Sequence, residues 1–174
     1  MSRPKSTALP IAYVSLRILI VLNWVYGAAI LGLVAFTFVN EAWFMKAIHV
    51  PAGTDAGPIM VGLRAIALLG VCAVPLNHLV LTRLLRIVET VGRGDPFVRD
   101  NAYRLNAIAW TLLALNLLSI VIGAIGKAIE SKAFPLHLDA GFSVNGWLCV
   151  VLAFVLARVF AEGTLMREDL EGTV

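Results

Sequence analysis

Charged residues are scarce in this sequence of 174 residues, of which 14% are charged and 60% are hydrophobic. A soluble domain has about a quarter charged residues and about half apolar ones. The mean hydropathy of +0.88 therefore exceeds what one soluble core of this size can bury. The composition excludes an ordinary soluble domain and indicates that lipid covers much of the chain.

Cysteine is also rare. Cys72 and Cys149 both fall inside apolar runs, without a partner at metal-site spacing, and we interpret them as small buried hydrophobic side chains. No recognisable arrangement of serine, histidine and acid is present, and no phosphate-binding glycine loop. We therefore expect a non-enzymatic protein that uses no cofactor and no metal.

The chain has three histidines. His49 and His137 fall in segments between apolar runs, and Asp139 is close to the second of them, so these residue types could form a zinc site. Their spacing matches no ligand pattern, and solvated loop side chains are the preferred interpretation. His78 lies beside Asn77 in an apolar run, where we expect an interhelical hydrogen bond rather than a proton relay.

Four stretches have the roughly twenty apolar residues that a membrane span requires. They are residues 11–39, 59–81, 105–125 and 142–161. Because lipid cannot satisfy backbone hydrogen-bonding groups, each stretch is predicted to be a helix. The first is too long for a cleavable signal. The sequence predicts an all-α integral membrane four-helix bundle that forms a single domain over residues 1–174.

Basic residues are divided unequally between the two sides of these spans. Ten lie on the side of the two termini: Arg3, Lys5, Arg17, Arg83, Arg86, Arg93, Arg99, Arg104, Arg158 and Arg167. Four lie on the other side: Lys46, Arg64, Lys127 and Lys132. By the positive-inside rule both termini, the loop 82–104 and the tail 162–174 are cytoplasmic. The net charge of +3 is spread over several loops, so direct nucleic-acid binding is not expected.

Several polar side chains are expected inside the spans: Asn23, Arg64, Asn77, His78 and Asn116. Arg64 is near the outer end of the second span and is expected to extend toward the interface. Pro75 is expected to kink that span and free a carbonyl group. The asparagines are expected to hydrogen-bond across helices, and a polar pathway or ligand pocket is the alternative. Because no acid lies at the centre of a span, coupled transport is disfavoured.

The loop between the second and third spans is predicted to be a helical hairpin. Apolar residues at helical spacing extend the second helix beyond the membrane, until Gly92 and Gly94 end it. The next helix is expected to begin at the Asp95–Pro96 pair or, alternatively, at Asp100 as its cap. Phe97 then lies at the tip of the hairpin or beneath it.

The fourth helix is expected to continue into an acidic tail. Its acidic residues are Glu162, Glu168, Asp169 and Glu171. One hypothesis is that the tail folds back and pairs with arginines of the loop. Exposed pairs contribute only about 0–1 kcal/mol each, so packing of Leu165, Met166 and Leu170 would hold the tail in place. The alternative is a solvated tail.

Two segments carry a family resemblance, GRGDPFVRDNAYRLNAIAW at 92–110 and ARVFAEGTLMREDLEGTV at 157–174. They resemble the bacterial membrane family catalogued as domain of unknown function 2975. The matching residues are Gly94, Asp95, Pro96, Phe97, Asn101, Arg104, Leu105, Phe160, Gly163, Leu165, Asp169, Leu170, Thr173 and Val174. The resemblance implies a multi-pass protein of the bacterial inner membrane. Many members are encoded beside a small Cro-like helix-turn-helix regulator, which implies a cytoplasmic transcription regulator as partner.

Two functions fit these observations. The first is a regulatory or interaction protein whose cytoplasmic surface binds such a regulator. The candidate residues are Arg93, Asp95, Phe97, Arg99, Asn101, Arg104, Glu168 and Asp169. The second is a small transporter, channel or lipid-binding bundle that uses the intramembrane polar residues. Ala28 and Gly32 permit a homo-oligomer, but packing within one chain explains them equally well.

Overall fold

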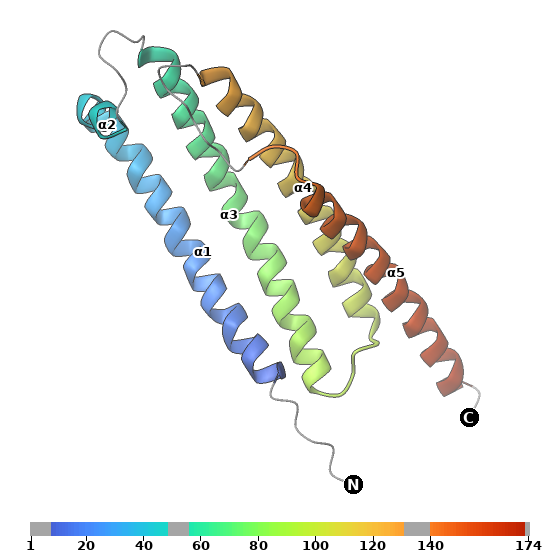
Figure 1. Ribbon diagram of the computed structural model, residues 1–174. Coiled ribbons are helices and arrows are strands. Elements are labelled where there is room, and N and C mark those ends of the chain that lie inside the picture. Colours follow the sequence, from blue (N-terminus) through green and yellow to red (C-terminus); the bar gives the residue numbers. More distant parts are fainter. Residues whose placement is uncertain (1–7, 49–55, 131–139, 173–174) are drawn as a thin grey trace.

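The computed structural model describes residues 8–48, 56–130 and 140–172. Over these residues it contains five helices and no strand: α1 (Ala8–Val39), α2 (Glu41–Ala47), α3 (Ala56–Gly92), α4 (Arg99–Ile129) and α5 (Val144–Gly172) (Figure 1). All but α2 are long and apolar enough to cross a membrane. The predicted all-helical fold with four membrane spans is confirmed, and the chain is a multi-pass membrane protein.

The four long helices lie side by side in a row (Figure 1). Helix α1 packs on α3, α3 packs on α4, and α4 packs on α5. A soluble protein would have to close such a row around a core, but lipid can cover both faces of a membrane protein. Large apolar side chains accordingly remain exposed along α1 and α5. Both cysteines, expected to be buried, are exposed on the helices.

The row has two ends, which we name by their connections. The loop end holds residues 93–98, between α3 and α4, together with the first turn of α1 and the last turns of α5 (Figure 1). The junction end holds the α1–α2 junction and the start of α3. Helices α3, α4 and α5 extend past their predicted spans at the loop end, which confirms the predicted helical extensions.

Helices α1 and α3 approach closely near their middles. A Cβ atom added at Gly27 would lie 2.9 Å from Val74 Cγ2, so the absence of a side chain permits the contact. On the same face, Asn23 Nδ2 donates to the Val74 carbonyl at 3.0 Å. One turn further along α3, Trp24 Nε1 donates to His78 Nδ1 at 3.2 Å. The two helices are thus joined by close packing and two interhelical hydrogen bonds.

Helix α5 is shifted along α4 toward the loop end. Its first turn contacts Asn116, whose Nδ2 donates to the Gly146 carbonyl at 3.4 Å. Asn116 lies thirteen residues before Ile129, the last residue of α4, which corresponds to about 20 Å of helix. Just before α5, Gly141 N donates to Ser119 Oγ at 3.1 Å. The shift makes α5 project beyond the start of α4, beside the 93–98 loop (Figure 1).

Candidate functional site

Helix α3 ends in a glycine-dependent cap at the loop end. Gly94 has a φ of +91°, a conformation that favours glycine. Its N–H donates to the Val91 carbonyl at 3.0 Å, and the Asp95 N–H donates to the Thr90 carbonyl at 3.1 Å. This pair of bonds is a Schellman motif, which satisfies carbonyl groups at a helix end. The predicted end of this helix at Gly92 and Gly94 is confirmed.

Asn101 joins the end of α3, the loop and the start of α4. Its side chain is fully buried, with 0% exposure. The amide nitrogen donates to Thr90 Oγ1 at 2.7 Å and to the Pro96 carbonyl at 2.9 Å. The amide oxygen accepts from Arg104 Nη1 at 2.8 Å. Because one side chain supplies all three bonds, Asn101 fixes the shape of the connection.

Neither predicted start of α4 is correct. The helix begins at Arg99 after Val98, which has an extended backbone and supplies no side-chain cap. Asp100 lies in the first turn, where a negative charge interacts favourably with the helix dipole. It pairs with Arg104 at 3.2 Å. The Asn101 N–H instead donates to the Val98 carbonyl at 2.9 Å. The start of α4 thus has no side-chain cap, and the Asn101 side chain instead joins the loop to the end of α3.

Phe97 packs against α5. Its ring centroid lies 5.3 Å from that of Phe160. A Cβ atom added at Gly163 would lie 2.8 Å from Phe97 Cδ1, so the ring occupies space that only a glycine leaves open. Next to Gly163, Thr164 is buried and donates to the Phe160 carbonyl at 2.8 Å. Phe97 lies against the tail helix, and 41% of the residue remains exposed.

Two ion pairs cross between the loop region and the tail. Arg167 Nη1 lies 2.8 Å from Asp95 Oδ1, and Arg99 Nη2 lies 3.0 Å from Glu168 Oε2. The tail therefore docks on the loop. The prediction that packing of Leu165, Met166 and Leu170 holds the tail in place was wrong, because all three residues are exposed. In α5 it is Phe160 and Gly163 that contact Phe97.

The candidate partner-binding residues separate into two groups. Asn101 is buried and Arg104 is largely covered, so both shape the loop from within. The others are exposed and form one surface, which we call the loop–tail surface: Arg93, Asp95, Phe97, Arg99, Glu168 and Asp169. It comprises residues from the 93–98 loop, the first turn of α4 and the last turns of α5.

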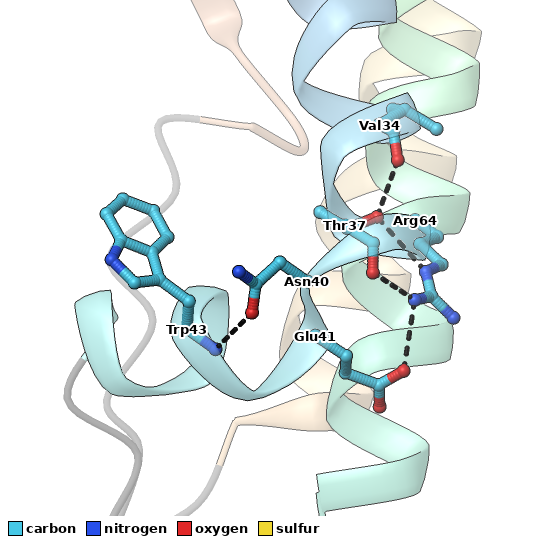
Figure 2. A network of polar contacts seen from close by, with 6 residues as sticks. All are labelled: Val34, Thr37, Asn40, Glu41, Trp43 and Arg64. Atoms are coloured by element: carbon cyan, nitrogen blue, oxygen red, sulfur yellow. Dashed lines mark hydrogen bonds and ion pairs between the residues drawn. The ribbon is translucent and has the colours of Figure 1, made fainter.

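Arg64 organises the junction end (Figure 2). Its guanidinium donates to the Thr37 carbonyl at 2.7 Å and to Thr37 Oγ1 at 3.2 Å, and it pairs with Glu41 at 3.2 Å. It also lies 4.1 Å from the centroid of the Phe38 ring. Carbonyl groups in the last turn of a helix lack intrahelical partners, and Arg64 satisfies that of Thr37. The sequence did not reveal these partners, because Thr37 and Glu41 lie more than twenty residues before Arg64.

The remaining intramembrane polar residues lie in separate places. Asn23 and His78 are within the α1–α3 contact. Asn116 donates to the Leu112 carbonyl of its own helix and to α5. Asn77 is exposed on α3. Asn23 and Asn116 therefore lie between different pairs of helices and do not face one another.

Pro75 lies within α3, and the helix continues through it to Gly92. Asn23 donates to the carbonyl of the preceding residue, Val74. The three residues weighed as a metal site, His49, His137 and Asp139, lie outside the described residues. Within residues 8–48, 56–130 and 140–172, no group of three or more His, Cys, Asp or Glu side chains could hold a metal ion.

Comparison with known proteins identifies one family. Residues 45–174, about three quarters of the chain, match the model of a family described as protein of unknown function (DUF2975). The match covers α3, α4 and α5, and it begins after α1. Neither the curated proteins nor the solved structures give a significant match.

Proposed function

The chain belongs to the DUF2975 family, and from this membership we propose that it is a regulatory membrane protein that binds a soluble cytoplasmic partner. The observation that carries the proposal is the contact of Phe97 with Phe160 and Gly163. It joins two segments that are some sixty residues apart in sequence. A defined polar surface outside the lipid is what specific recognition of a soluble protein requires.

The charge distribution supports a cytoplasmic position for this surface. The sequence assigns ten of the fourteen basic residues to the side of the two termini, and cytoplasmic loops carry the excess of Lys and Arg. We place the chain in the inner membrane of a bacterium, with both termini in the cytoplasm.

We propose a small helix-turn-helix transcription regulator as the partner. Proteins that resemble this chain are often encoded beside such a regulator. Capture at the membrane would hold the regulator away from its DNA sites, so the proposed role is non-enzymatic and needs no cofactor. The mixed charge of the loop–tail surface, with Arg93 and Asp169 exposed beside the two ion pairs, supports electrostatic steering of a specific partner.

A transporter or channel has less support. Such a protein needs polar groups that converge on one pathway. Asn23 contacts α3, Arg64 contacts the α1–α2 junction, and Asn116 contacts α5. These side chains hold helices together in three different places.

The test is capture of the regulator encoded beside this chain by the full-length tagged protein from its native membrane. We expect Arg93→Glu to reduce capture at least about fivefold, because rim charges govern encounter. Lys127→Glu is the matched control, since it reverses an exposed charge on the last turn of α4. No capture by the unaltered chain, or an equal loss with Lys127→Glu, would reject the proposal.

A further inference from the structure

A groove of about 480 Å³ lies between α4 and α5 near the loop end. Three alanines, Ala102 on α4 with Ala157 and Ala161 on α5, are among its lining residues. Their small side chains leave space that larger residues would fill. The volume is in the range of sites that accept small molecules, about 300–1,000 Å³.

One part of the groove is cationic. Arg99 from α4 and Arg158 from α5 line it, and their side chains are 64% and 79% exposed. Each pairs with a tail carboxylate, Arg99 with Glu168 and Arg158 with Glu162. Neither carboxylate is among the lining residues. A guanidinium has five N–H donors, so one carboxylate leaves donors for a second anion.

The part of the groove toward the middle of α4 is mostly apolar, with one amide, Asn106, among its lining residues. Phe154 lines it and makes an edge-on contact with Trp110, at 5.3 Å between ring centroids. Trp110 is 59% exposed and continues the apolar surface toward the middle of α4. Tyr103, with its phenol group, lies one turn from Arg99 at the cationic part. The groove therefore changes from cationic to apolar where the predicted spans 105–125 and 142–161 meet the membrane surface.

We propose that this groove binds one anionic phospholipid, with its phosphate between Arg99 and Arg158 and an acyl chain along Phe154. Guanidinium groups suit phosphate because they donate two parallel hydrogen bonds. Basic pockets between membrane helices at the cytoplasmic side are typical sites for anionic headgroups. The lining has two arginines and no acidic residue, so it favours a lipid with a net negative charge over a zwitterionic one. The site does not depend on the proposed regulator and goes beyond that function.

The test uses the full-length chain in micelles that contain equal amounts of phosphatidylglycerol and phosphatidylcholine. Native mass spectrometry measures which lipid stays bound. We expect one phosphatidylglycerol to be retained in about tenfold preference to phosphatidylcholine. The double variant Arg99→Gln/Arg158→Gln is expected to lose most of this preference, at least about fivefold.

Two further variants make the result specific. Arg86→Gln/Arg93→Gln removes the same charge from exposed arginines at the loop end that do not line the groove, and should keep the preference. Ala161→Leu fills the groove without changing charge and should reduce bound lipid. Circular dichroism confirms that each variant remains helical. The proposal is overturned if the unaltered chain shows no preference, if the Arg86/Arg93 variant loses as much, or if Ala161→Leu binds normally.

Discussion

The two ends of the molecule hold their helices by different means. At the junction end, Arg64 contacts the end of α1, the start of α2 and the Phe38 ring. At the loop end, the helices are held together by a buried amide at Asn101, a ring contact at Phe97 and several exposed ion pairs. Among the described residues, a single charge makes several contacts at the junction end, whereas the loop end combines contacts of different kinds.

The difference follows from exposure to water. The Arg64 side chain is only 19% exposed, so protein groups must replace the water that would otherwise solvate its charge. The tail ion pairs are exposed, and water and salt weaken them. At the loop end, stability must therefore come from buried and apolar contacts, while the charges remain accessible to other molecules.

The largest effect is expected from Asn101→Ala. The change leaves partners of a fully buried amide without hydrogen bonds, at a cost of about 3 kcal/mol in unfolding free energy. Thermal or SDS-induced unfolding in detergent, followed by circular dichroism, measures it. Asn106→Ala, at an exposed position on the same helix, is the control and should change little. An equal effect of both variants would show that Asn101 has no special role.

Arg64→Met is expected to cost about 2 kcal/mol, because the Thr37 carbonyl and Glu41 lose a charged hydrogen-bond partner. The loss should appear as weaker packing of α1 on α3, measured by crosslinking of cysteines introduced at Gly27 and Val74. Lys127→Met removes an exposed charge from the last turn of α4 and should leave crosslinking unchanged. Unaltered crosslinking in Arg64→Met would contradict a role of Arg64 in holding α1 against α3.

Gly163→Val is expected to cost about 1–2 kcal/mol, since the added side chain would overlap the Phe97 ring. The same change in a Phe97→Ala background should cost much less, because the conflicting ring is gone. A double-mutant cycle on unfolding free energies gives the coupling. Equal costs in both backgrounds would mean that helix α5 itself requires Gly163, and that the contact with the Phe97 ring does not.

The smallest effect is expected from Glu168→Gln, below about 1 kcal/mol, because its pair with Arg99 is exposed. The difference should shrink further at high salt. Glu130→Gln, an exposed position beyond the end of α4, is the control in the same unfolding assay. A loss as large as that of Asn101→Ala would erase the distinction between buried and exposed contacts at the loop end.

The sequence predicted most of the fold, because long apolar segments have few alternatives in lipid. It predicted the spans and the extension of α3 to Gly92, and it left open whether the tail docks on the loop or is solvated. It did not predict the start of α4, because the residue before the helix, Val98, has an extended backbone and supplies no side-chain cap. It assigned tail packing to Leu165 and Met166, because composition does not reveal which face of α5 meets the loop.

The sequence by itself determined that the chain is helical, crosses a membrane four times and has the start of its first span and the end of its last span on the same side. Apolar length and the lack of hydrogen bonds in lipid require this. Only the tertiary structure decided that Phe97 meets Gly163, that Arg64 satisfies the Thr37 carbonyl, and that a cationic groove opens between α4 and α5. These contacts depend on how far one helix is shifted along the next, and side-chain packing fixes that shift.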